Sequence, residues 1–136
     1  MAFQDTLYGV IRLLTCGIWV GAAMFKLSHF QGFVDKLAEF NQPLPRAMAA
    51  GVVVIELGGS LFMLANLYVW AVCIAWIAFI LYATYVEHRR VTTPDGEIDF
   101  HQYVQVCKNI SLIGGLLALM MLDPAKPEWL MTLLGS

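Results

Sequence analysis

Four polar side chains interrupt long apolar stretches of the chain: Arg12, Glu56, Lys108 and Asn109. Glu56 is nearly central in its stretch, whereas Arg12 and Lys108 lie nearer the ends of theirs. A charge at the centre of a membrane-spanning helix costs about 2.5–3.5 kcal/mol on insertion scales, so it needs a partner or a function. A carboxylate that lies between two cations with long side chains can form an ion pair with either of them.

Apart from the cations simply extending their charged ends to the membrane interface, two interpretations of these residues stay open. In the first, Glu56 forms an ion pair with Arg12 or Lys108 and only holds helices together. In the second, Arg12, Glu56, Lys108 and Asn109 line a polar pocket. Two cations facing one carboxylate leave a positive surplus, which favours an anionic or carbonyl-bearing ligand such as a quinone head group.

Small residues indicate which faces pack inside a bundle. The helical neighbours of Glu56 are mostly small, so its side chain is expected in the interior. The pairs Gly17 and Gly21, and Gly114 and Gly115, are expected to allow close helix packing.

Other chemistry is not supported by residue types and spacing. The three histidines, His29, His88 and His101, lie outside the apolar stretches, where they cannot be axial haem ligands within the bundle. No metal-ligand spacing occurs, and the cysteines are scattered without a Cys-x-x-Cys. A net charge of −2 excludes a nucleic-acid partner. We therefore expect no metal, no covalently bound cofactor and no disulfide.

The elements that carry these residues are transmembrane helices. Of 136 residues, 60% are hydrophobic and 13% are charged, which is too apolar for a soluble domain of this size. Four apolar blocks, at about 7–25, 47–67, 68–86 and 103–122, each approach the roughly 20 residues that cross a bilayer. The sequence predicts one all-α transmembrane domain over residues 1–136, an integral membrane four-helix bundle in contact with lipid.

The connections between the blocks also have recognisable patterns. A single helix over 47–86 would be roughly 60 Å long, twice a hydrocarbon core, so a turn is expected at Asn66-Leu67-Tyr68. Apolar residues from Phe30 to Phe40 recur at helical spacing and predict a short amphipathic interfacial helix in the first loop. Pro94-Asp95-Gly96 predicts a hairpin in the third loop. The block 68–86 carries no charge and is expected to face lipid or a partner protein most.

The distribution of basic residues predicts the orientation. The two long loops contain five (Lys26, Lys36, Arg46, Arg89 and Arg90), whereas the opposite side has Lys126 alone. By the positive-inside rule, the loops lie in the cytoplasm and both termini outside. We expect a multi-pass protein of a bacterial-type inner membrane.

Three groups of residues carry a resemblance to a known family. Arg12, Gly17, Gly21 and Lys26-Leu27 resemble the first helix of the DoxX family, and Glu56-Leu57-Gly58-Gly59 resembles its second. Lys108-Asn109 followed by Gly114-Gly115 resembles the fourth. The chain departs from the family pattern at Asn66, where a glycine is common, and in its longer Pro94-Asp95-Gly96 loop.

The resemblance implies a four-helix membrane protein linked to quinone redox chemistry. Family members include a subunit of thiosulfate:quinone oxidoreductase. We therefore expect a membrane subunit that is a quinone-linked or membrane-anchoring partner of a larger oxidoreductase, with electrons supplied by a protein partner. The alternatives are a purely structural accessory subunit, or a small metabolite or anion carrier, although the inverted repeats typical of carriers are not seen.

Overall fold

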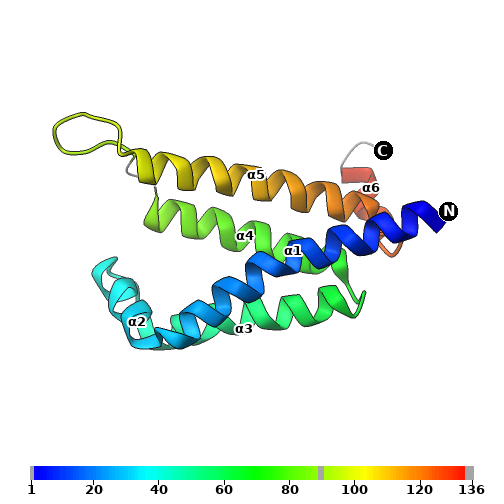
Figure 1. Ribbon diagram of the computed structural model, residues 1–136, viewed down its shortest axis with the longest axis horizontal. Coiled ribbons are helices and arrows are strands. Elements are labelled where there is room, and N and C mark those ends of the chain that lie inside the picture. Colours follow the sequence, from blue (N-terminus) through cyan, green and yellow to red (C-terminus); the bar gives the residue numbers. More distant parts are fainter. Residues whose placement is uncertain (1, 89–90, 134–136) are drawn as a thin grey trace.

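The structure is a bundle of long helices (Figure 1). The computed structural model describes residues 2–88 and 91–133, so Arg89 and Arg90, two of the residues behind the predicted orientation, lie outside the described residues. Within those ranges, four helices are long and apolar enough to cross a membrane: α1 (Ala2–Ser28), α3 (Pro45–Leu64), α4 (Val69–Glu87) and α5 (Phe100–Leu122). The shorter α2 (Phe30–Glu39) and α6 (Glu128–Leu133) complete it. The predicted all-α membrane bundle is confirmed.

Local signals in the chain explain where the helices begin and end. Pro45 occupies the first turn of α3, where its missing N–H costs nothing. The Asp99 side chain caps α5 by accepting a hydrogen bond from the Gln102 backbone N–H at 3.1 Å. Between α3 and α4, Asn66 and Tyr68 adopt positive φ angles of 58° and 50°. The predicted turn at Asn66-Leu67-Tyr68 is therefore confirmed.

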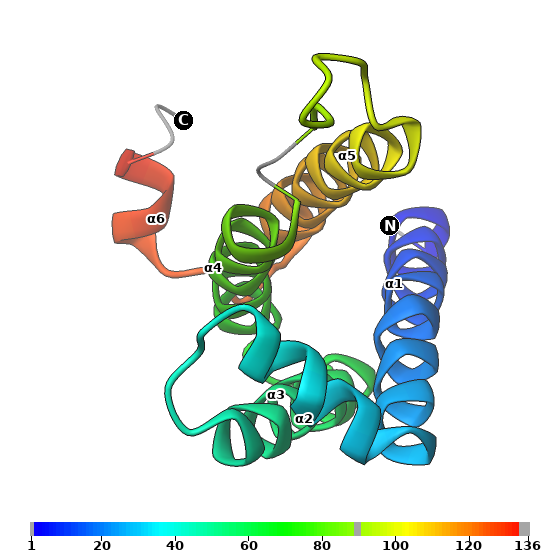
Figure 2. The same ribbon diagram turned by 90° about the vertical axis from the view of Figure 1, so that its left-hand side faces the viewer.

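The helices form two halves, which we define as the first half (α1, α2 and α3) and the second half (α4 and α5). α1 packs along α3, and α4 packs along α5. Between the halves, α3 approaches α4, and α1 approaches α5 over a short stretch only. Viewed from the loop end, α1 stands apart from α4 and α5 (Figure 2).

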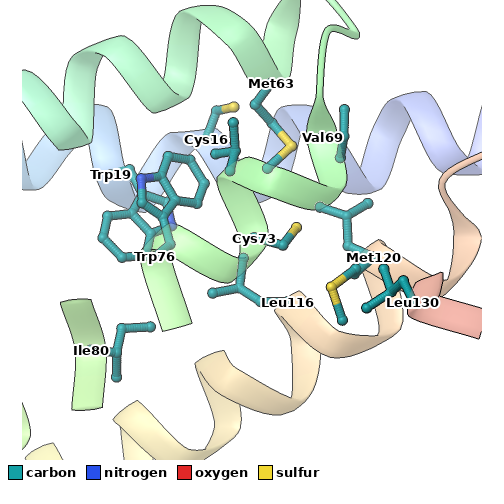
Figure 3. Close-up of a cluster of buried hydrophobic side chains, with 12 residues drawn as sticks. Cys16, Trp19, Met63, Val69, Cys73, Trp76, Ile80, Leu116, Met120 and Leu130 are labelled. Atoms are coloured by element: carbon teal, nitrogen blue, oxygen red, sulfur yellow. The ribbon is translucent and has the colours of Figure 1, made fainter. Parts of the chain in front are cut away.

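The hydrophobic core joins the halves from the middle of the bundle towards the termini. The Trp19 and Trp76 rings stack across the α1–α4 gap, with centroids 4.2 Å apart and planes inclined by 14° (Figure 3). Their large rings fill a space that the backbones leave open. The core cluster comprises Cys16, Trp19, Met63, Val69, Val72, Cys73, Trp76, Ile80, Leu116, Leu119, Met120 and Leu130.

Among the described glycines, Gly59 is the one against which a neighbouring helix packs. A Cβ atom at this position would lie 2.6 Å from Nε1 of Trp76. At Gly17, Gly21, Gly114 and Gly115, by contrast, a Cβ would meet nothing within 4 Å. Among the described residues, no neighbouring helix uses the close approach that these four glycines allow, because α1 and α5 pack through other faces.

The two loop predictions are confirmed. α2 buries Val34 and Leu37 against Ala49 of α3, so it is amphipathic and folds onto the bundle; its place at a membrane interface stays a prediction. In the third loop, Thr92 pairs with Ile98, and Gly96 closes the turn at a φ of 85°.

The uncharged helix α4 is not the helix that faces outward most, contrary to the prediction that it would face lipid or a partner protein most. Its residues Cys73 and Trp76 are fully buried, and it lies centrally in the end view (Figure 2). A smaller share of α1 than of α4 is buried inside the bundle. The prediction failed because a helix that is apolar on all sides gives no signal of which side packs.

Candidate functional site

A cavity of about 470 Å³ lies between the two halves, at the loop end of the bundle. All five helices from α1 to α5 contribute to it. Its wall is mostly apolar and aromatic, and polar groups are concentrated towards the loops. The apolar lining comprises Ile18, Trp19, Ala22, Phe25, Phe33, Leu37, Met48, Val52, Phe79, Ile80, Ala83, Val86 and Leu112.

The polar centre of the cavity is an ion pair between Lys26 of α1 and Glu56 of α3. Lys26 Nζ lies 2.5 Å from Glu56 Oε1. Glu56 is 2% exposed, and its second oxygen, Oε2, is buried without a hydrogen-bond partner among the described residues. Lys26 also lies over the Phe33 ring, 5.5 Å from its centroid. The interior position expected for Glu56 is confirmed, but its partner is Lys26.

Arg12 does not belong to this site. Its guanidinium donates a hydrogen bond to the Met63 carbonyl oxygen at 3.0 Å and lies over the Tyr8 ring. α1 and α3 run antiparallel, so a residue earlier in α1 meets one later in α3. Met63 lies two turns beyond Glu56, roughly 10 Å along the axis at 1.5 Å per residue. The predicted ion pair between Arg12 and Glu56 is therefore wrong.

Lys108 and Asn109 line the same cavity from α5. The Lys108 ammonium donates to the Gln105 side chain, so the predicted direct pair with Glu56 is also wrong. Asn109 is buried and donates to Thr84 Oγ1 at 2.8 Å, which ties α5 to α4. Three of the four predicted site residues, Glu56, Lys108 and Asn109, thus line one cavity, while Arg12 lies outside it.

Further polar residues that line the cavity near the loops were not predicted. Lys36 of α2 pairs with Glu87 of α4, with Nζ and Oε2 2.5 Å apart. His88 Nδ1 lies 2.6 Å from Gln102 Oε1. Lys36, Glu87 and His88 all line the cavity. Each is in or beside a loop in the sequence, where only the tertiary fold shows what it faces.

A second buried carboxylate, Asp123, was also missed. It is 2% exposed and follows α5 at the opposite end from the cavity. Its side chain accepts hydrogen bonds from the backbone N–H groups of Trp70 and Ala125, both at 2.9 Å. Asp123 therefore caps the start of α4, which is a structural role. The sequence signal that could have identified this residue is an acid directly after an apolar helix.

The described part of the chain contains neither a cluster of metal ligands nor a disulfide. No group of three or more His, Cys, Asp or Glu side chains there is arranged to hold a metal ion. Cys16, Cys73 and Cys107 are free, the first two of them buried in the core.

Comparison with known proteins supports the sequence resemblance. The DoxX family model matches residues 8–89. No curated protein and no solved structure matches the chain. The matched segment contains Lys26 and Glu56, whereas the resemblance at Lys108 and Asn109 lies beyond it and stays a prediction. Since the match spans more than half of the chain, this protein is a membrane protein of the DoxX family.

Proposed function

We propose that this protein is a quinone-binding membrane subunit of a larger oxidoreductase, with the quinone head group held in the cavity between the two halves. The observation that supports this proposal is the buried, unpartnered Oε2 of Glu56 beside the Lys26 ammonium. A polar acceptor and a donor side by side in an otherwise apolar wall are what an amphipathic ligand needs.

The cavity residues match the hydrogen-bonding pattern of a quinone. A quinone offers carbonyl oxygens, which accept hydrogen bonds, and Lys26 and Lys108 are donors from opposite walls. A hydroquinone offers hydroxyl groups, which donate, and Glu56 Oε2 is an acceptor. The volume of about 470 Å³ lies within the usual range of small-molecule sites, about 300–1,000 Å³. The aromatic wall suits a flat ring.

The chemistry that a bound quinone supplies is the uptake of two electrons and two protons. The chain's own residues hold the head group and place proton donors and acceptors against its oxygen atoms. Lys26 and Glu56 do so in a buried environment, where electrostatic interactions are stronger than in water. The electrons come from a partner subunit.

The Lys26–Glu56 pair also favours a second candidate function, a purely structural accessory subunit. The pair joins α1 to α3. If it acts only as a clasp, the chain anchors a complex and binds no quinone.

Glu56→Gln separates the two functions. The glutamine keeps the size of the side chain, but it presents an N–H group where Oε2 accepts a hydrogen bond. We expect affinity for a reduced short-chain quinol, decylubiquinol, to fall about tenfold or more, the equivalent of a lost bond to a charged group. Affinity for the oxidised form should fall less. Both are measured anaerobically in lipid nanodiscs by quenching of tryptophan fluorescence, since Trp19 lines the cavity.

Glu39→Gln is the matched control, because Glu39 is exposed and lies outside the cavity lining. It should leave both affinities unchanged. Absence of saturable quenching in the wild-type protein, together with a lower melting temperature of Glu56→Gln, would establish the structural function instead.

A further inference from the structure

The side of the cavity between α1 and α5 is not covered by another helix. α1 approaches α5 over a short stretch, and no Cα atom of α1 lies within 8 Å of α4 among the described residues. From the loop end, α1 and α5 stand apart with no described element between them (Figure 2). The cavity lining includes Ile18, Ala22 and Phe25 of α1 and Leu112 of α5, so the cavity itself extends to this side.

The residues on this side belong both to the cavity and to the outer surface. Ile18 and Phe25 line the cavity, yet they are 43% and 66% exposed. Ile18 and Leu112 both lie near the middle of their helices. The middle of a spanning helix lies near the centre of a hydrocarbon core about 30 Å thick. The opening is therefore at the depth of the lipid acyl chains.

The loop end of the cavity, in contrast, is crossed by polar contacts between α2 and α4. Lys36 pairs with Glu87, and Tyr82 donates to the Gln42 side chain just after α2. Both contacts tie α2 and the residues after it to α4 at this end of the cavity. The side between α1 and α5, in contrast, is lined by apolar side chains.

We propose that the cavity opens sideways into the bilayer between α1 and α5, and that its ligand is a lipid-dissolved molecule whose apolar chain lies in that opening. The proposal rests on the proposed function for the head group, but a different set of residues carries it. Ile18, Ala22, Phe25 and Leu112 hold the chain, while Lys26 and Glu56 hold the head group.

Ala22→Phe tests the opening, because it adds a ring to the wall one turn from Lys26 without removing a polar group. Decylubiquinone and the same benzoquinone ring without a chain are titrated against the protein in nanodiscs. The variant should lower affinity for decylubiquinone about tenfold and change affinity for the chainless ring less than twofold. Equal losses for both probes, or no loss for either, would overturn the proposal.

Ala78→Phe is the matched control, since Ala78 is exposed on α4 and outside the cavity. Comparing the two variants also cancels the partitioning of the probe into lipid. If Ala22→Phe lowers the melting temperature by more than Ala78→Phe does, Leu112→Phe narrows the opening from the other wall and replaces it. Leu112→Phe must then lower the affinity for decylubiquinone much more than the affinity for the chainless ring.

A brominated fatty acid, 9,10-dibromostearate, separates failure of this inference from failure of the proposed function. Its chain quenches tryptophan on contact and carries no quinone ring. Quenching that Ala22→Phe reduces and Ala78→Phe does not supports the lateral opening, even if no quinone binds. Quenching that is identical in both variants contradicts the opening, even if the chainless quinone binds.

Discussion

Lys26 and Glu56 neutralise each other's charge at a position where the acid is shielded from water. The pair is short, and Glu56 is almost completely buried. Removing one partner of a buried pair leaves an unpaired charge, whereas replacing both with apolar side chains is often neutral. The pair therefore makes the stability of the bundle depend on both residues together.

Lys26→Met should destabilise the protein by about 3–5 kcal/mol, because Glu56 is left buried without its cation. The double variant Lys26→Met with Glu56→Met should recover stability to within about 1 kcal/mol of the wild type. Unfolding in mixed micelles with increasing denaturing detergent measures both values.

Lys36→Met is the control for this prediction. Lys36 is 49% exposed, and breaking its pair with Glu87 should cost less than about 1 kcal/mol. Equal destabilisation by Lys26→Met and Lys36→Met would contradict the importance of burial at Lys26.

Sequence reasoning at the residue scale identified the buried acid but not its partner. The central position of Glu56 and its small neighbours were sufficient to predict an interior side chain. Lys26 was assigned to the loop, because the apolar block ends at Phe25, whereas α1 continues to Ser28. The antiparallel register of α1 and α3, which pairs Lys26 with Glu56 and Arg12 with Met63, is a tertiary property without a sequence signal.

At the scale of the helices, the contact between Gly59 of α3 and Trp76 of α4 fixes how the two halves meet. The Trp76 indole packs where a side chain at position 59 would be, and its Nε1 donates to the Ile55 carbonyl oxygen at 3.2 Å. Trp76 in turn stacks on Trp19, which lines the cavity. The wall of the cavity therefore depends on Gly59, which has no side chain and so leaves room for the Trp76 ring.

Gly59→Ala should destabilise the protein by about 1–3 kcal/mol, the usual range for overpacking a core. It should also reduce the near-ultraviolet circular dichroism of the stacked tryptophans. Thermal unfolding and the near-ultraviolet spectrum measure the two effects.

Gly58→Ala is the neighbouring control, since a Cβ there meets nothing within 4 Å. Alanine is the better helix former by about 1 kcal/mol, so this variant should be neutral or stabilising. If Gly58→Ala and Gly59→Ala unfold at the same temperature, the close contact with Trp76 has no energetic role.

The existence of the four long helices could be predicted, but neither their ends nor all of their contacts. Apolar length and the break at Asn66 were sufficient for the spans and the turn. Glycine spacing was misleading at Gly17 and Gly21, because a small residue permits close packing but does not require it. Gly59, within the resemblance motif, is the position where packing does require it.

At the scale of the whole molecule, both long loops lie at one end of the bundle and both termini at the other (Figure 1). The orientation predicted from the basic residues requires both long loops at the same end. Lys26, Lys36 and Arg46 all lie at that end. Which end faces the cytoplasm is still a prediction from the positive-inside rule.

Cysteine labelling tests the orientation. With Cys107 replaced by serine, Asp95→Cys in the loop should resist a membrane-impermeant maleimide in intact cells. Glu128→Cys, at the opposite end in α6, should react. Labelling of Asp95→Cys in intact cells, with Glu128→Cys protected until lysis, would reverse the orientation.

The division into two halves has a consequence for biosynthesis. Two contacts of the first half join α1 to α3: Lys26 pairs with Glu56, and Arg12 donates to the Met63 carbonyl. A contact of the second half joins α4 to α5, since Asn109 bonds to Thr84. As the ribosome releases the chain from its N-terminus, α1 and α3 can therefore leave the translocon as a hairpin in which the charges of Lys26 and Glu56 already neutralise each other. α4 and α5 can follow as a second hairpin, so the buried Glu56 does not have to enter the lipid without its cation.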